Sequence, residues 1–244
     1  MNEKTLVKNK VNQFILRIDL PKDSRLDLRQ LALDLRDDYI RIVENTEHNF
    51  NLNVDNYEVT QRDFINYTLY AENGVQLTIN NSVEKFIVFE AKTYLDNGVY
   101  IDRLDAIIKK ISNQEIEEVF SSRIGMRYVN IFPCERVDRI KKILQAPNDK
   151  EIVNLLRKDQ LNRAVVVEEF NCGDYQVRVQ YGIFNKFYPS VVKNYDITLD
   201  IDVYYGAKIS IAEWKEVIRT YNHAAYAKFI EYVSPNYIEE MRDE

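Results

Sequence analysis

The sequence is poor in the residues on which the common enzyme chemistries depend. Its 244 residues include two histidines, two cysteines and six glycines. Zinc sites usually need clustered His and Cys ligands, whereas His48 and His223 are far apart in the chain. Two cysteines, Cys134 and Cys172, are too few for a disulfide framework. We therefore expect no metal site and no other cofactor.

The glycine-dependent motifs of nucleotide-binding proteins are also missing. The chain has no G-x-x-x-x-G-K-[ST] or G-x-G-x-x-G segment, which are the loops that hold phosphates in P-loop and dinucleotide-binding proteins. It also lacks the G-x-S-x-G segment that carries a nucleophilic serine. The sequence therefore favours a protein that is not an enzyme.

Long apolar runs are absent as well. No run approaches the roughly 18 residues that a membrane-spanning helix needs. Residues 1–14 lack both the apolar stretch and the small-residue cleavage site of a secretory signal. We expect a cytoplasmic protein that does not bind a membrane.

The charge balance bears on nucleic-acid binding. With 33 basic and 39 acidic residues the net charge is −6, whereas sequence-independent binding relies on several phosphate contacts from Lys and Arg. Nucleic acid is therefore disfavoured as a partner. A weaker alternative is a local patch on one predicted helix, formed by Arg136, Arg139, Lys141 and Lys142.

Hydrophobic periodicity predicts two series of strands and helices. In the first half we expect strands at 11–20, 39–43, 57–63, 65–70, 75–79 and 86–89, and helices at 26–37 and 101–111. In the second half we expect strands at 124–132, 164–170, 175–183 and 195–204, and helices at 137–144, 149–156 and 211–233. Ser24 is expected to cap the first helix, the polar residues 44–56 to form a loop, and Ser234-Pro235 to begin a short last helix.

We interpret the two series as variants of one order, β-α-β-β-β-α. Pro21 and Pro133 close the first strand of each half and lie 112 positions apart, and the same offset carries 86–91 onto 198–203. Short turns between consecutive strands favour antiparallel sheets with helices on one face. We predict an α+β fold of two similar halves, 1–118 and 119–244, which form either two domains or one continuous domain and end in a long helix.

An acidic strand supplies the first candidate binding residues. Asp196, Asp200 and Asp202 alternate with apolar residues, so the three carboxylates share one face of the strand. Mg²⁺ and Ca²⁺ prefer such oxygen ligands. Metal sites normally draw ligands from more than one segment, however, and no second segment is evident. A solvent-facing or ion-paired strand is therefore favoured.

A basic strand is the natural counterpart. Arg123 and Arg127 share a face with Gly125, which leaves room for a close approach to the backbone. Because the arginine fork matches a carboxylate in a bidentate way, we expect a structural ion pair with Asp200 or Asp202. The alternative is an arginine pair that binds an anion or a phosphate.

The segment around these arginines resembles a known signature. Arg123-x-Gly125-x-Arg127-Tyr128-x-Asn130 resembles the central R-x-G-x-R-Y-x-N motif of a sporadically distributed bacterial family of unknown function. Further matches in the same order are Tyr94, the Leu199–Asp202 strand, and His223 followed by Phe229. The chain departs from the family at Asn222, where members often carry Leu, and at 131–133. The resemblance implies no established reaction, but it does imply genes that travel with mobile elements and a role in host–phage conflict.

Two functional hypotheses of different class follow. The first is a non-enzymatic protein that binds another protein or forms a homodimer, favoured by the missing catalytic motifs, the long last helix and the 17 tyrosines, a residue enriched at interfaces. The second is an enzyme or a nucleotide- or anion-binding protein. Its candidate ligand-binding residues are Arg123, Arg127, Asn130, Asp200, Asp202 and His223. The first hypothesis predicts that these charged residues pair with one another, and the second that they converge on an open pocket.

Overall fold

The computed structural model describes residues 10–53, 57–92, 97–114, 118–134, 139–145, 162–193 and 195–242. It shows an α+β protein with a large antiparallel sheet. The chain divides into two compact units. The N-unit comprises Ile15–Gly125 and Gly206–Ile218, and the C-unit comprises Met126–Tyr205, Arg219–Glu244 and the segment that ends at Phe14.

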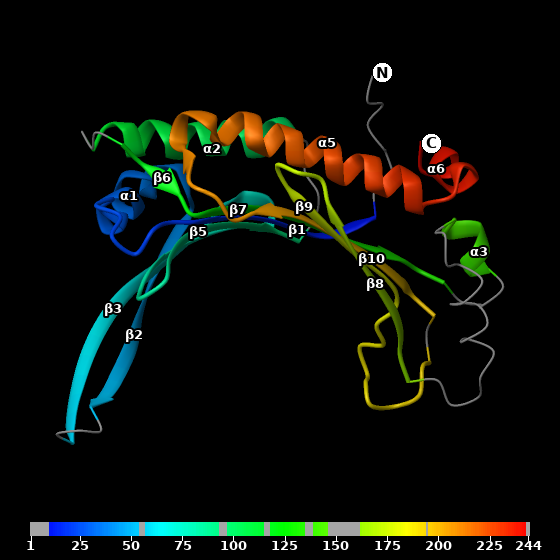
Figure 1. Cartoon of the computed structure of the whole chain (residues 1–244), viewed down its shortest axis with the longest axis horizontal. Coiled ribbons are helices and arrows are strands. Elements are labelled where there is room, and N and C mark those ends of the chain that lie inside the picture. Colours follow the sequence, from blue (N-terminus) through cyan, green and yellow to red (C-terminus); the bar gives the residue numbers. More distant parts are fainter. Residues whose placement is uncertain are drawn as a thin grey trace. The chain divides into compact units, whose positions relative to one another are not determined.

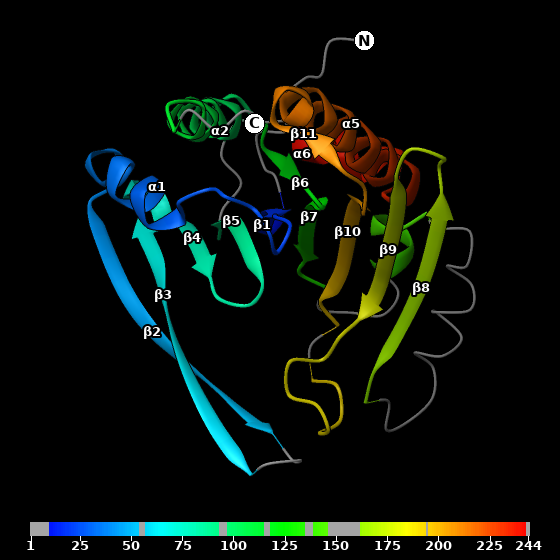
Figure 2. The ribbon, with the colours of Figure 1, turned by 60° about the vertical axis from the view of Figure 1, so that its left-hand side comes forward.

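The N-unit holds five strands of the sheet in the order β2-β3-β4-β5-β1. Its sheet strands are β1 (Val11–Asp19, shared with the C-unit), β2 (Arg41–Asn53), β3 (Glu58–Tyr70), β4 (Val75–Asn81) and β5 (Lys85–Ala91). Its other elements are α1 (Leu28–Asp34), η1 (Arg36–Asp38), η2 (Glu72–Gly74), α2 (Asn97–Ser112), the short pair β6 (Phe120–Ser121) and β11 (Ile209–Ser210), and η4 (Ile211–Glu213). Figures 1 and 2 show α1 and α2 on the same side of these strands.

The C-unit continues with strands in the order β7-β10-β9-β8. Its elements are β7 (Arg123–Phe132, shared with the N-unit), α3 (Ile140–Ile143), β8 (Ala164–Asn171), β9 (Gln176–Ile183), β10 (Ile197–Tyr205), α5 (Trp214–Tyr232, of which the part up to Ile218 belongs to the N-unit) and α6 (Pro235–Arg242). With η4, α5 makes a helix of 22 residues. The helix α5 packs on β7 and β9 (Figure 2), since Tyr128 of β7 donates to Asn222 Oδ1 at 2.6 Å and the Tyr181 ring of β9 contacts the Tyr232 ring.

Strands β1 and β7 contribute residues to both units. Within the N-unit, Ser122 N donates to Asp19 O at 2.8 Å, and within the C-unit, Ile131 N donates to Lys10 O at 2.9 Å. The two bonds join residues at opposite ends of the strands, so β1 and β7 run antiparallel.

Much of the predicted pattern is present. Strands β1, β4, β5, β7, β8, β9 and β10, helix α2, the long helix and the helix that begins at Pro235 all lie where periodicity predicted them. In β4 and β5, alternate residues pair within the core, as Leu77 does opposite Phe89 and Ile79 opposite Ile87. The helix predicted at 149–156 lies outside the described residues.

Three expectations were wrong. Residues 44–53 are not a loop but the outer part of β2, and the runs 57–63 and 65–70 form one strand, β3. The N-cap of α1 is Asp27, not Ser24, because the Asp27 carboxylate accepts a hydrogen bond from Gln30 N at 2.9 Å.

Among the described residues, no helix has both the length and the hydropathy to cross a membrane.

The C-unit core contains a buried tyrosine with an acidic partner. Tyr232 is fully buried, its ring meets that of Tyr181 with centroids 5.2 Å apart, and its hydroxyl donates to Glu168 Oε2 at 2.5 Å. Burial raises the pKa of Tyr232, and the hydrogen bond to Glu168 raises it further. The folded protein therefore resists loss of this proton.

Alkaline pH is expected to destabilise the protein through this tyrosine. Above about pH 10 a tyrosine of the unfolded chain loses its proton while Tyr232 of the folded chain keeps it, so the free energy of unfolding falls by about 1.4 kcal/mol per pH unit. The contribution of Tyr232 to the free energy of unfolding is therefore complete below about pH 10 and is lost as the pH rises above it. Tyr232→Phe should make the decline shallower by that amount, measured by urea denaturation from pH 8 to 11. Tyr57→Phe, at an exposed position, is the control and should leave the slope unchanged; equal slopes in all three proteins would contradict the argument.

Candidate functional site

The arginine and aspartate strands meet in the C-unit. Arg127 donates from Nε to Asp200 Oδ1 at 2.8 Å and from Nη2 to Asp200 Oδ2 at 2.6 Å. The Asp200 side chain is 4% exposed and that of Arg127 is 44% exposed. The hydrogen bond to Asp200 raises the pKa of Arg127 above its usual value. The geometry is that of a bidentate ion pair, with the carboxylate buried and the guanidinium half open to water.

Further charges on the same face of these strands are matched across the sheet. Asp202 lies opposite Arg178 of β9. Arg178 Nε lies 3.5 Å from Glu169 Oε1 of β8. With its amide oxygen turned toward Arg178, Gln180 accepts a hydrogen bond from Arg178 Nε at 3.1 Å. Acidic, basic and amide side chains therefore alternate across β10, β9 and β8.

The other candidate residues lie elsewhere. Asn130 is buried and donates to Leu199 O at 3.1 Å, which joins β7 to β10. His223 is exposed on α5. Because Tyr128 points toward α5 and successive strand residues point to opposite faces, Arg127 projects from the face opposite to that helix. Asn130 and His223 thus lie on the helix side of the sheet, and the ion pair lies on the other.

Arg123 belongs to the N-unit. Its Nη1 lies 3.6 Å from Asp19 Oδ2, and Arg17 Nε lies 2.6 Å from Asp19 Oδ1. Arg123 and Arg127 therefore each have their own carboxylate. Among the described residues, no group of three His, Cys, Asp or Glu side chains is arranged to hold a metal ion.

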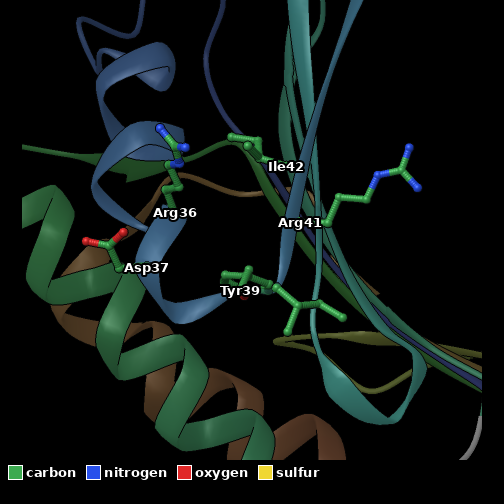
Figure 3. A pocket seen from close by; sticks show the side chains of 6 residues that line it. Arg36, Asp37, Tyr39, Arg41 and Ile42 are labelled. Carbon is green, nitrogen blue, oxygen red and sulfur yellow. The ribbon is translucent and has the colours of Figure 1, made fainter.

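A hollow of about 430 Å³ lies in the N-unit where α1 leads into β2. Its lining residues are Arg36, Asp37, Tyr39, Ile40, Arg41 and Ile42. Figure 3 shows the guanidinium groups of Arg36 and Arg41 pointing in different directions, with Asp37 turned away from both. A ligand site needs a few polar groups that converge, and this hollow does not supply them.

A long hairpin of the N-unit has the most distinctive surface. Strands β2 and β3 pair residue by residue from Arg41 opposite Tyr70 to Asn53 opposite Glu58. Strand β4 pairs only with Tyr67–Tyr70 of β3. In the described strand pairing, residues 45–53 and 58–66 therefore pair only with each other, and we call them the ribbon. Figures 1 and 2 show these strands extending beyond the other elements of the N-unit.

One face of the ribbon carries exposed apolar side chains near its outer end. Phe50, Leu52 and Val59 are 62%, 63% and 64% exposed, and Leu52 lies directly opposite Val59. The same face carries His48 and Asp63, whose Nδ1 and Oδ1 atoms lie 2.8 Å apart. That contact lowers the pKa of Asp63. Sequence reasoning missed the β2 side of the ribbon because its polar residues resembled a loop, although the alternation of Phe50 and Leu52 with asparagines was a strand signal.

The C-unit also exposes apolar side chains, on the segment between β9 and β10. They are Phe187, Tyr188 and Val191. The Asn185 amide donates to Asn162 O at 2.8 Å and to Ser190 O at 2.6 Å, which holds this segment in shape. Unlike the ribbon, this segment has no extended strand face. Phe187 therefore provides a matched control for substitutions in the ribbon.

Comparison with known proteins adds no relative: no family model matches the chain, and no curated protein matches it.

Proposed function

We propose that this is a non-enzymatic binding protein that holds another protein chain through the ribbon. The observation that carries the proposal is the exposure of Phe50, Leu52 and Val59 on one face of a two-stranded segment that pairs with no third strand among the described residues. A two-stranded hairpin is marginally stable in water by itself. Grouped exposed apolar side chains are typical of interaction sites. A bound partner would bury this face and stabilise the ribbon.

The charged strands support binding through the ribbon rather than anion binding. Both oxygens of Asp200 already accept hydrogen bonds from Arg127. A phosphate approaching Arg127 would meet a guanidinium whose charge the buried carboxylate already balances, and taking over the donors that bind Asp200 would leave that carboxylate unpaired, which is costly. We infer that the pair joins β7 to β10. The alternative hypothesis is an enzyme or a nucleotide- or anion-binding protein. It is weakened because the guanidinium of Arg127 already binds Asp200.

We also infer that the two series of elements arose by duplication. Counting outward from β1, the strands follow the order β5, β4, β3, and counting outward from β7 they follow β10, β9, β8. Pro21 and Pro133 follow the first strand of each series. Among the described residues, β2 has no counterpart in the second series. The ribbon is thus the feature in which the two series differ, which supports a role of its own.

The cellular setting is a separate inference. The resemblance of 123–130 to a bacterial family of patchy distribution supports an accessory role in a mobile-element or phage-defence system. With a net charge of −6, nucleic acid remains a disfavoured partner. We propose a cytoplasmic protein whose partner is a protein chain.

Removing the apolar face of the ribbon tests the function. The full-length chain, tagged and purified from its own cells, should co-purify with a stoichiometric partner chain or as an oligomer. The double variant Phe50→Ser, Leu52→Ser should lower that association at least about tenfold, since each buried side chain of this size contributes about 1.5–3 kcal/mol. Both residues are exposed, so the free energy of unfolding should change by less than about 0.5 kcal/mol each.

Phe187→Ser is the matched control, because it removes an exposed aromatic side chain from the C-unit. Association should survive this change. A wild-type protein that always purifies as a lone monomer, or an equal loss with Phe187→Ser, would contradict the proposal.

A further inference from the structure

The outer edge of β2 offers a second chain a place to bind. In the strand order β2 comes first, so among the described strands it pairs on one edge only, with β3. It has 13 residues and contains no proline. The unpaired N–H and C=O groups of such an edge are a template for another strand. Natural edge strands are usually short, bulged or rich in lysine, and β2 is long and has no lysine.

The sequence of this edge is complementary to itself. On the face that carries Phe50 and Leu52, residues at equal distances before and after Thr46 have matching character. The matched pairs are Glu44 with His48, Ile42 with Phe50, and Ile40, just before β2, with Leu52. In an antiparallel pair of β2 strands centred on Thr46, these residues lie directly opposite one another. A carboxylate then faces an imidazole, and apolar side chains face apolar side chains at both ends.

The opposite face of the strand tolerates the same register. There Arg41 would lie opposite Asn51, Val43 opposite Asn49, and Asn45 opposite Glu47. None of these pairs brings like charges together. Each pair occurs twice, once on each side of Thr46. Pairing centred on Thr46 therefore introduces no electrostatic penalty on either face.

Neighbouring registers are worse. A centre at Asn45 would place Ile42 opposite His48, and a centre at Glu47 would place two Glu47 carboxylates opposite each other. A centre at Glu44 would likewise oppose two carboxylates. Like charges directly opposite one another destabilise a sheet. Of these registers, the one centred on Thr46 is the one that satisfies both the charges and the apolar residues.

We propose that the partner of the ribbon is a second copy of this chain. The β2 strands of two copies pair antiparallel about a two-fold axis beside Thr46, which gives a closed, isologous dimer. Two apolar clusters then form, one at each end of the paired strands, where Ile40 and Ile42 of one copy lie beside Leu52 and Phe50 of the other. This inference rests on the proposed function, because it names the chain that the ribbon binds.

Cysteine cross-linking tests the register. Opposite Cα atoms of antiparallel strands are about 4.5–5.5 Å apart, within the range of about 4.4–6.8 Å that a disulfide spans. Thr46→Cys, in a Cys172→Ser background that removes the exposed native cysteine, should form a disulfide-linked dimer in oxidised glutathione, which accepts the two electrons and two protons that the thiols lose. Sedimentation velocity should show the wild-type chain as a dimer.

Glu44→Cys in the same background is the matched control. Its symmetry mate would lie four residues away along the partner strand, about 13 Å, so it should cross-link at least about tenfold more slowly. An equimolar mixture of the Glu44→Cys and His48→Cys proteins should cross-link efficiently, because these two positions face each other. Equal cross-linking of Thr46→Cys and Glu44→Cys, or a wild-type chain that stays monomeric at high concentration, would overturn the proposal.

The failure of this inference can be told apart from failure of the proposed function. If the wild-type chain is monomeric but a different protein co-purifies and is lost with the Phe50→Ser, Leu52→Ser variant, the ribbon binds a protein other than itself. If the chain is dimeric, but the Phe50→Ser, Leu52→Ser variant dimerises as well as the wild type and Thr46→Cys forms no cross-link, both proposals fail.

Discussion

Gly182→Ala is expected to destabilise the protein by more than about 3 kcal/mol, a large part of the roughly 5–15 kcal/mol that stabilises an ordinary folded protein. Gly182 lies in β9, opposite Thr198 of β10 on one edge and Val165 of β8 on the other. Its φ is 132°, a value that other residues rarely adopt. A Cβ atom there would lie 2.2 Å from Ala164 O. That oxygen belongs to the backbone of the adjacent strand, so the clash is relieved only by separating the strands.

Gly173→Ala separates the two causes of this effect. Gly173 also has a positive φ, 84°, but a Cβ atom there would meet no atom within 4 Å. The left-handed conformation alone costs alanine about 1–2 kcal/mol. Chemical denaturation of both variants should therefore show a modest loss for Gly173→Ala and a severe loss, or no soluble protein, for Gly182→Ala. Equal losses would show that β8 can move away at little cost.

Arg127→Ala is expected to cost about 3–5 kcal/mol, because it leaves the buried Asp200 carboxylate without its partner. Asp200→Ala should cost less, about 1–2 kcal/mol, because the half-exposed guanidinium that remains is still hydrated. The order of the two losses, measured by urea denaturation at neutral pH, follows from the unequal burial of the partners.

The double variant Arg127→Met, Asp200→Leu tests the same interpretation. Replacing both members of a buried pair by apolar residues is often neutral or stabilising, so this variant should be more stable than Arg127→Ala. A loss of less than about 1 kcal/mol for Arg127→Ala would contradict the burial argument and reopen Arg127 as a ligand-binding group.

The candidate site shows how far sequence alone could go. Alternation in β10 correctly placed Asp200 and Asp202 on one face, since strand residues alternate by local geometry. The fork of Arg127 indicated a carboxylate partner, and the structure supplies Asp200. Sequence reasoning had no means of knowing that Asn130 and His223 lie on the helix side of the sheet. That depends on which face the helix α5 covers.

The ribbon is a feature that sequence reasoning did not predict correctly. The strand pattern of its β2 side was present in Phe50 and Leu52, yet polar composition favoured a loop because a strand is normally recognised by the core that it helps to bury. Here residues 45–53 and 58–66 have only each other as strand partners in the described pairing, and Phe50, Leu52 and Val59 remain exposed. Pairing between β2 and β3 stabilises these residues as strands, and that pairing is a contact between two segments rather than a property of either.

By itself, the sequence determined the α+β class, most strands and the long terminal helix, because hydrophobic periods of 2 and 3.6 residues are local signals. The tertiary structure decided the strand order, the Asp27 cap, the clash-prone position of Gly182 and the exposure of the ribbon. Each of these depends on which distant segments come together. Backbone geometry at one residue constrains its neighbours in the chain but leaves open which strand will lie beside it.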